Sequence, residues 1–393
     1  MLKAFLTIFF GLILGLGIGI FLVFSTKGNS TPLSPMNLKQ AIQPAKKESL
    51  GFLPYWLLDK AKNDYSGYIT TLDYFSLTLD VDGTILKSTT PVELEPGWHA
   101  LTSGSVDTFL NTAKSKNIKL SISIFDGSQA SIDRVLDDPS TAGTNLVNDM
   151  SKVMSKYGFS DLNLDIESIT EATPAAQLKF AQFVSEVRNQ ISLQKLPYTL
   201  SIDIAPIDFI KNNRLIKPEL IEKYVDKIIL MAYDFHSPGS FVTGPVAPLG
   251  GAGTIAEFDT KVGVEKALKV TTPGKILLGI PFYGYSWETI DNFERAAIVP
   301  SSAVITSNST VEDILSKCTN CSTQFDDIAK EAYVIYKDND TNTYHQIFYP
   351  DKKSTEAKVN FVNSEGLAGI AIWALGYEGG SVINPIQSFL LYH

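Results

Sequence analysis

Short apolar runs alternate with longer helical patterns along most of this chain, and this order limits its fold more than any other feature. The runs that we expect to form strands are residues 51–56, 68–77, 119–125, 162–167, 198–204, 227–233, 275–282 and 368–373. The helical patterns among them are residues 106–116, 141–157, 174–193, 218–224 and 256–270. Such alternation is typical of parallel β/α architecture, and eight strands predict a closed (β/α)8 TIM barrel. In that fold the functional side chains lie at the C-terminal ends of the strands.

A small α+β insertion is expected between the seventh and eighth barrel strands, at about residues 286–364, because the regular spacing breaks there. It contains two strand-like runs, residues 333–336 and 346–349, and a helical pattern at residues 311–317. We expect this insertion to form one wall of the groove at the barrel mouth.

The chain has two cysteines, Cys318 and Cys321, which form a single C-x-x-C inside the expected insertion. Outside the cytoplasm such a pair is a candidate for a disulfide that closes a tight loop. A zinc site would need a second pair, which this sequence lacks. A thioredoxin-type redox site is not favoured, because the pair does not follow a strand at the start of a helix.

The N-terminal residues predict one transmembrane helix. Residues 4–24 form an uncharged, almost wholly apolar run that is long enough to cross a bilayer. The run exceeds the apolar core of a typical signal peptide, and no small-residue cleavage pattern follows it. We therefore predict a cytoplasmic stub and uncleaved signal anchor in residues 1–27, a flexible linker at 28–48, and a globular domain at 49–393. This domain would then be membrane-anchored and extracytoplasmic, with a cleaved signal and a secreted protein as the alternative.

Composition excludes several function classes. Hydrophobic residues make up 44% of the chain and charged residues 19%, which suits a large folded core and argues against disorder in the bulk of the chain. The net charge is −9 and no basic tract occurs, so nucleic acid is not an expected partner. The four histidines form no metal-binding motif, so we expect no protein-built metal site.

The fourth expected strand carries polar side chains on one face and apolar side chains on the other, because the two kinds alternate along it. Its polar positions are Asp161, Asn163, Asp165 and Glu167. An apolar back face suits a strand that helices cover, and a site where Asp165 and Glu167 both meet a substrate explains the polar face most simply. Their Cα atoms are expected about 6.5 Å apart, close enough for one carboxyl to shift the pKa of the other.

An edge strand and a calcium loop are the two alternatives for this stretch. The acids of an edge strand would merely face water, although the apolar back face argues for a strand inside a layered fold. The spacing of Asp161, Asn163 and Asp165 also matches the start of an EF-hand loop. That loop needs Gly at its sixth position and Glu at its twelfth, where this chain has Ile166 and Ala172, so we exclude calcium binding.

Polar and aromatic residues gather where the expected strands end. They are Trp56, Asp59, Asp126, Asp165, Glu167, Asp203, Tyr233, Asp234, Tyr283, Tyr285 and Trp373. Carboxylates transfer protons, and flat aromatic rings stack against sugar rings. Ordinary packing accounts for each aromatic residue alone, but their coincidence at several strand ends predicts a carbohydrate site.

Five segments of the chain resemble glycoside hydrolase family 18, the chitinase family. Asn163, Asp165 and Glu167 match its signature D-G-x-[DN]-x-[DN]-x-E, and residues 231–234 match its M-x-Y-D. The other segments are residues 51–56, 278–284 and 369–373, which resemble its first, seventh and eighth strands. Residues 344–349 with Lys358 look most like the bacterial branch of peptidoglycan-directed, spore-cortex N-acetylglucosaminidases. Ser160 and Asp161 depart from the usual Asp-Gly, and Ile166 replaces a frequent aromatic residue.

The resemblance implies a chemistry and a set of site residues. Glu167 is implied as general acid and base, Asp165 as the group that orients the 2-acetamido group of the sugar, and Tyr233 as a hydrogen-bond donor to it. The implied substrate-binding residues are Asn163, Asp234, Trp373, Trp56, Tyr283 and Met231. The implied function is substrate-assisted, retaining hydrolysis of β-1,4-linked glycans that contain N-acetylglucosamine, of peptidoglycan or chitin type. The family needs no metal or organic cofactor, and the alternative function is a non-catalytic, lectin-like barrel.

Overall fold

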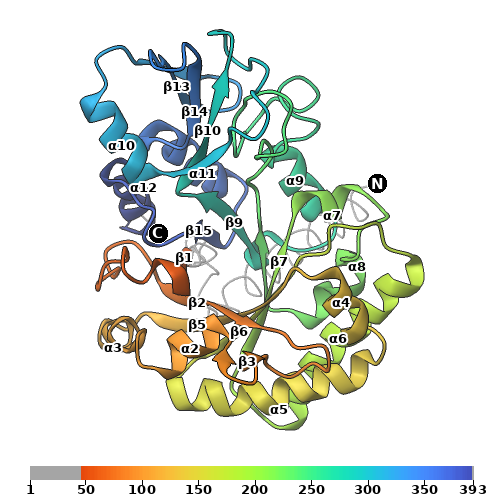
Figure 1. The fold of residues 1–393 in the computed structure, drawn as a ribbon. Coiled ribbons are helices and arrows are strands. Elements are labelled where there is room, and N and C mark those ends of the chain that lie inside the picture. The colour runs from red at the N-terminus through yellow and green to blue at the C-terminus, as the bar shows by residue number, and fades with distance from the viewer. Residues whose placement is uncertain (1–45, 392–393) are drawn as a thin grey trace, which may run out of the picture. The chain divides into compact units, whose positions relative to one another are not determined.

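The structure is a computed structural model that describes residues 46–391. Eight parallel strands close into a barrel in the order β1-β15-β9-β8-β7-β6-β5-β2 (Figure 1). They are β1 Glu48–Pro54, β2 Thr71–Thr78, β5 Lys119–Asp126, β6 Asp161–Ile166, β7 Thr199–Ile204, β8 Lys227–Leu230, β9 Ile276–Pro281 and β15 Gly369–Trp373. Each overlaps one of the expected strands, so the predicted (β/α)8 barrel is confirmed.

Helices surround the barrel (Figure 1). They are α2 Pro96–Thr102, α3 Asp107–Ser115, α4 Gln129–Val135, α5 Pro139–Tyr157, α6 Pro174–Leu193, α7 Pro206–Ile210, α8 Pro218–Ile221, α9 Thr260–Ala267, α11 Lys352–Ser364 and α12 Gly380–Leu391. Three 3-10 turns, η2 Tyr55–Leu57, η3 Glu222–Tyr224 and η4 Pro273–Lys275, and a short hairpin of β3 Ser88–Thr90 and β4 Glu93–Leu94 complete this part of the chain.

Helix α6 illustrates how the sequence sets these elements. The Thr173 side chain accepts a hydrogen bond from the Ala176 N–H, and Pro174 occupies the first turn, where its missing N–H costs nothing. The helix buries an apolar stripe that includes Phe180 and Val184. This stripe belongs to the large core between helices and barrel, which also holds Leu162, Leu164 and Ile166 from the apolar face of β6.

The insertion is a five-stranded antiparallel sheet in the order β11-β10-β14-β13-β12, with helix α10 Asn308–Lys317. Its strands are β10 Tyr283–Thr289, β11 Val304–Ser307, β12 Ser322–Asp326, β13 Glu331–Lys337 and β14 Tyr344–Tyr349. The sheet begins at Tyr283, earlier than predicted, because Gly284 lets β10 lie against β14: a Cβ there would come within 1.9 Å of the Phe348 carbonyl oxygen. Helix α11, which lies within the predicted bounds of the insertion, contacts α12, β9 and β15 as well as strand β13 of the insertion sheet.

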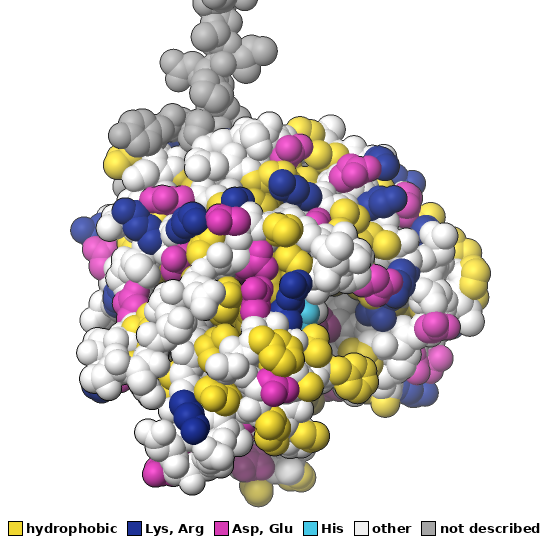
Figure 2. Space-filling model, turned by 90° about the horizontal axis from the view of Figure 1, so that it is seen from above, with side chains coloured by type: hydrophobic (Ala, Val, Ile, Leu, Met, Phe, Trp, Pro, Cys, Tyr) yellow, Lys and Arg dark blue, Asp and Glu magenta, His cyan; other side chains and the backbone are white. Residues whose placement is uncertain are grey.

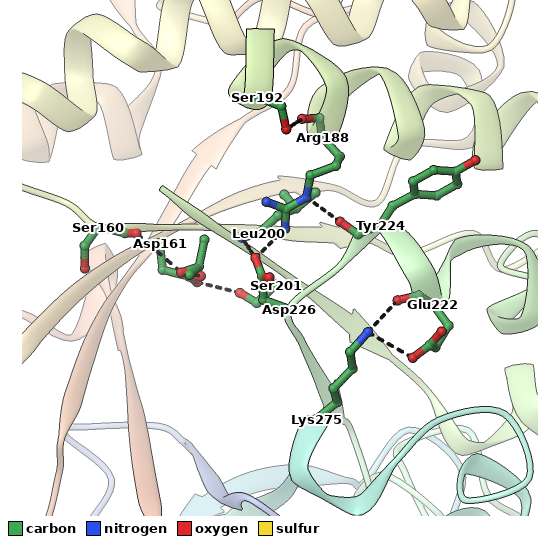
Figure 3. Close-up of polar contacts among 11 residues, drawn as sticks. Ser160, Asp161, Arg188, Ser192, Leu200, Ser201, Glu222, Tyr224, Asp226 and Lys275 are labelled. Carbon is green, nitrogen blue, oxygen red and sulfur yellow. Dashed lines mark hydrogen bonds and ion pairs between the residues drawn. The ribbon is translucent and has the colours of Figure 1, made fainter. Parts of the chain in front are cut away.

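Polar contacts link the elements at the N-terminal end of the barrel (Figure 3). Asp161 accepts hydrogen bonds from the hydroxyls of Ser121 at 2.9 Å and Ser201 at 2.6 Å. The Asp226 carboxylate pairs with the Arg188 guanidinium, which comes from α6. These contacts tie neighbouring strands and a covering helix together at the end of the barrel opposite the expected site.

Some predictions concern residues 1–45, which lie outside the described residues. The predicted membrane span at residues 4–24 is among them, and no helix within residues 46–391 is long and apolar enough to cross a membrane. The predicted linker ends earlier than residue 48, because Lys47 is buried and its Nζ donates to the Leu367 carbonyl at 2.6 Å.

On the face shown in Figure 2, acidic and basic side chains are interspersed and form no basic patch.

Candidate active site

A cavity of about 240 Å³ opens at the C-terminal ends of the barrel strands. Its lining residues are Asp165, Glu167, Asp203, Ala205, Met231, Tyr233, Asp234, Tyr283 and Trp373. They come from β6, β7, β10, β15 and the segments that follow β6, β7 and β8. The cavity therefore brings together seven of the nine residues that the sequence proposed for catalysis and substrate binding, with Asn163 and Trp56 outside its lining.

Strand β6 and its end position the two central carboxyls. Asp165 is buried with 2% of its surface exposed, while Glu167 directly follows the strand and faces the open cavity. The Glu167 N–H donates to the Asp126 carbonyl at 2.9 Å, which extends the pairing of β6 with β5 by one residue. The backbone that carries Glu167 is thus held by the neighbouring strand, as a precise proton transfer requires.

Asn163 lies one step deeper than Asp165 along the same face of β6 and is fully buried. Its Nδ2 donates to Ser201 Oγ at 3.1 Å and to Asp203 Oδ1 at 3.0 Å, and its Oδ1 accepts from Ser123 Oγ at 3.2 Å. Neighbouring strands thus engage the whole amide, and the sugar-binding role of Asn163 stays a prediction. Asn163 supports the floor of the cavity and holds Asp203.

Aromatic rings form the side of the cavity around Trp373. The Trp373 ring lies 4.6 Å from the Phe75 ring and 5.6 Å from the Phe52 ring, both of which are buried. Trp56 lies on η2 with its ring 6.4 Å from that of Trp373 and with 46% of its surface exposed. Its position extends the aromatic surface beyond the cavity, although it does not line the cavity itself.

The segment after β8 supplies Tyr233 and Asp234. Asp234 adopts the left-handed backbone conformation, with φ +59°, which is uncommon for a residue with a side chain. Its carboxylate accepts hydrogen bonds from the Tyr283 hydroxyl at 2.5 Å and the Tyr285 hydroxyl at 3.0 Å, both on β10. Gly279 on β9 makes room for this segment, since a Cβ there would lie 2.8 Å from the Tyr233 ring. The insertion sheet thus holds Asp234 in place.

The acids of the cavity have perturbed protonation. Removal from water raises the pKa of Asp165 well above its ordinary value, and the charges of Asp203, Glu167 and Asp73 raise it further. The pKa of Glu167 is also raised, first by desolvation and then by the negative charge of Asp234. Since no Lys or Arg lines the cavity, these carboxyls have no cation there to stabilise their charge. A carboxyl with a raised pKa keeps a proton that it can donate near neutral pH.

Comparison with known proteins agrees with this geometry. Residues 69–378 match the sequence profile of Glycosyl hydrolases family 18. The chain belongs to this family. It is therefore a glycosidase, and the family that the sequence motifs predicted is confirmed.

Curated relatives of this family 18 member include enzymes of bacteria and plants. The cortical fragment-lytic enzyme of Bacillus subtilis (strain 168) is 25% identical over 334 residues, covering 81% of this chain and 67% of that protein. A class V chitinase of Arabidopsis thaliana is 27% identical over 268 residues, covering 63% of this chain and 66% of that protein. The chain thus spans about two thirds of the length of these relatives.

Solved structures of family 18 proteins share the fold. The Group IV chitinase of Ostrinia furnacalis in complex with allosamidin superposes with a TM-score of 0.73 at 18% identity, covering 88% of this chain and 98% of that one. The spore cortex-lytic enzyme SleL of Bacillus megaterium QM B1551 superposes with a TM-score of 0.67 at 19% identity, covering 88% and 74%. At these identities the likeness is one of fold.

Two further features of this family 18 domain bear on the sequence predictions. Cys318 and Cys321 are joined by a disulfide at the end of α10, as the C-x-x-C spacing suggested. Among residues 46–391, no group of three or more His, Cys, Asp and Glu side chains is arranged to hold a metal ion. Asp203 also lines the cavity, although the family resemblance implies no role for this strand-end acid. The alternation of Ser201 and Asp203 on β7, parallel to that of Asn163 and Asp165 on β6, is the signal that points to it.

Proposed function

We propose that this glycosidase cleaves β-1,4-linked glycans containing N-acetylglucosamine, of peptidoglycan or chitin type, by substrate-assisted retaining hydrolysis. One observation carries the proposal: Asp165, Glu167 and Tyr233, at the C-terminal ends of two separate barrel strands, line a single cavity beside Trp373. The relatives support the substrate class, since their names include cortical fragment-lytic enzymes and chitinases, and a chitinase of Cycas revoluta is bound to (GlcNAc)3.

The first half of the proposed reaction breaks the glycosidic bond. Glu167 donates its proton to the glycosidic oxygen while the 2-acetamido carbonyl oxygen of the same sugar attacks the anomeric carbon. The bond to the leaving group breaks, and a positively charged oxazolinium ring forms. Asp165 accepts the acetamido N–H and stabilises this charge, while the Tyr233 hydroxyl donates to the acetamido group. Trp373 provides an apolar surface for the sugar ring.

The second half restores the enzyme. The Glu167 carboxylate accepts a proton from a water molecule, whose oxygen attacks the anomeric carbon and opens the oxazolinium ring. Two attacks on the anomeric carbon retain its configuration. No metal or organic cofactor enters these steps. The raised pKa of Glu167 suits this double role, because its carboxyl must hold a proton before the first step and release it during that step.

A matched substrate pair tests substrate assistance. The full-length protein, purified in detergent, should cleave a chromogenic N-acetylglucosaminide and leave the glucoside that lacks the acetamido group nearly intact. A thiazoline that mimics the bicyclic intermediate should inhibit, because it resembles what the site stabilises. Similar turnover of both glycosides would refute substrate assistance and indicate a carboxylate nucleophile. If the protein binds the oligosaccharide but cleaves neither the glycosides nor the oligosaccharide itself, that result supports the lectin-like alternative.

We also propose that residues 4–24 anchor the enzyme in a membrane, with the glycosidase domain outside the cytoplasm. The length of the apolar run and the missing cleavage pattern support this proposal. N-terminal sequencing of the mature protein tests it. A mature chain that keeps residues 4–24 and fractionates with membranes is expected, whereas a chain that starts after Phe24 indicates a secreted enzyme.

A further inference from the structure

A second buried carboxyl lies beside Asp165. Strands β6 and β7 pair in parallel with Asn163 opposite Ser201 and Leu164 opposite Ile202, so the next two residues place Asp165 and Asp203 side by side. Both carboxyls line the cavity, and their exposed fractions are only 2% and 3%. Two carboxyl groups at such close quarters and out of water do not both ionise near neutral pH.

The hydrogen bonds around this pair are asymmetric. Asp203 Oδ1 accepts the Asn163 amide at 3.0 Å, whereas Asp165 Oδ1 is buried and has no hydrogen-bond partner within residues 46–391. An unpartnered buried carboxylate oxygen is costly, and a protonated neighbouring carboxyl is the donor that would satisfy it. The titratable groups around the pair are Asp73, Asp161, Glu167, Tyr233 and Asp234, which bring no positive charge.

We propose that Asp165 and Asp203 form a carboxyl dyad that shares one proton, with Asp203 holding the proton whenever Asp165 accepts the acetamido N–H of the sugar. This rests on the proposed role of Asp165. The dyad carries a single negative charge, placed on Asp165, where the positive oxazolinium develops. Asp203 does not touch the substrate in this scheme. It is a positioning residue that acts through Asp165, and its proton stays within the dyad through the reaction.

The arrangement also explains Asn163. The family signature accepts Asp or Asn at this position, and this chain has the amide, which removes an acid from the flank of Asp165 on its own strand. The structure supplies an acid from the next strand instead, and the amide of Asn163 orients it. Asp203 therefore supplies the neighbouring carboxyl that an aspartate at position 163 would supply.

The pH profile of Asp203→Ala distinguishes a shared proton from simple charge repulsion, because alanine can donate no hydrogen bond to Asp165, whereas an asparagine amide still could. If Asp203 is only a like charge, its removal makes Asp165 easier to ionise and moves the acid limb of kcat to lower pH. If the two share a proton, Asp165 loses its donor, so the acid limb moves to higher pH and kcat falls by about tenfold or more. A limb that moves to lower pH, or an unchanged profile, overturns the dyad.

A swap and a control complete the kinetic test. The double variant Asn163→Asp/Asp203→Ala returns an acid to β6 and should recover part of the kcat lost in Asp203→Ala, while a double variant no more active than Asp203→Ala counts against the proposal. Asp73→Asn removes another fully buried acid that does not line the cavity. Its acid limb should not move to higher pH.

Infrared spectroscopy tests the dyad without catalysis, which separates it from the proposed mechanism. The full-length protein is measured above pH 7, since burial raises the pKa of Asp73 to about 7. The wild type should show a protonated carboxyl band that Asp203→Asn loses and Asp73→Asn keeps. If wild type and Asp203→Asn show the same protonated carboxyl band, the dyad is refuted, and this result does not depend on the substrate specificity. If Asp203→Asn does not fold, Asp203→Ala takes its place in this comparison, and it too must lose the band.

Discussion

Both ends of the barrel gather acidic side chains, but acids at the N-terminal end pair with lysine and arginine, whereas the lining of the cavity contains neither. There, Asp226 pairs with Arg188 and accepts the Leu200 N–H at 2.9 Å, and Glu222 pairs with Lys275 at 2.9 Å (Figure 3). At the C-terminal end, the carboxyls that line the cavity have no lysine or arginine among their neighbours in that lining. The same barrel thus contains two acidic clusters, one whose charges are neutralised by cations and one that has no cation in its lining.

The pKa values of acids at the two ends are shifted in opposite directions. The hydrogen bond from Lys275 lowers the pKa of Glu222, so its carboxylate is stabilised in the folded protein. Burial raises the pKa of Asp165 and of Glu167, so their charged forms are disfavoured there. Acids whose charged forms burial disfavours thus lie at the proposed active site, whereas acids at the opposite end are paired with cations.

The largest expected effect is the loss of turnover in Glu167→Gln. The amide keeps the shape of the side chain but has no proton to transfer, so kcat on an unactivated oligosaccharide should fall by about 10²–10⁴-fold. Glu222→Gln is the matched control at the other end of the barrel and should leave kcat unchanged. Steady-state kinetics and sugar binding by calorimetry measure both. Near-normal turnover of the Glu167 variant would show that another group is the acid.

The second prediction concerns stability. Because the folded-state pKa of Asp165 lies above its ordinary value of 3.8, ionisation favours the unfolded chain as pH rises between these two values. Asp165→Asn should therefore raise the free energy of unfolding at neutral pH by about 1–3 kcal/mol while abolishing most turnover. Below about pH 3.8 the gain should vanish, since both states are then protonated. Thermal denaturation across pH measures this, and a loss of stability at neutral pH contradicts it.

The third prediction concerns Asp226→Asn, the corresponding substitution at the N-terminal end of the barrel. The amide oxygen can still accept the Leu200 N–H, but the charge that faces Arg188 is lost. Hydrogen bonds to charged groups contribute about 1.5–3 kcal/mol, and the pair is partly exposed, so we expect a loss of about 1 kcal/mol with unchanged kcat. Denaturant unfolding at neutral pH measures the loss. Opposite signs for Asp165→Asn and Asp226→Asn would confirm the contrast between the two ends, and equal signs would remove it.

The barrel and the acids at its C-terminal end were predictable from the sequence, whereas the ion pairs at its N-terminal end were not. The alternation in residues 160–167 placed Asp165 and Glu167 on one face of a buried strand, and the spacing of runs predicted all eight barrel strands. The alternation did not show how deep each side chain lies along the barrel axis. Asn163 and Asp165 point to the same side, but only Asp165 reaches the cavity. Side-chain direction follows from local geometry, whereas depth depends on the register between strands.

Pairings between distant segments could not be predicted from the sequence either. The first strand of the insertion sheet, β10, pairs Tyr285 with Phe348, a partner 63 positions away, and it reads in sequence as a continuation of β9. The relation between Asp165 and Asp203 likewise exists only once β6 and β7 are in register. Local patterns specify helices and strands, but they do not specify which distant residues become neighbours.

The smallest expected effect is that of Lys275→Met, which leaves Glu222 without its partner at the N-terminal end. Lys275 Nζ donates to the Glu222 carboxylate at 2.9 Å and to the Glu222 carbonyl at 3.0 Å, with 30% and 24% of the two side chains exposed. Solvent screens such a pair, so we expect a loss of only about 0.5–1 kcal/mol at neutral pH. Because the folded-state pKa of Glu222 lies below 4.5, the pair's contribution should be present above that pH and disappear as pH falls through the folded-state pKa.

Salt and a matched lysine variant sharpen this last prediction. The difference between wild type and Lys275→Met should shrink in high salt, since mobile ions screen a partly exposed pair. Lys269→Met removes a more exposed pair with Glu265, whose side chains are 60% and 66% exposed, and should change stability less. Denaturant unfolding at two salt concentrations and two pH values measures all three proteins. A Lys275 effect that exceeds that of Asp226→Asn, or that grows at low pH, would show that the N-terminal acids do not stabilise the barrel through their charge.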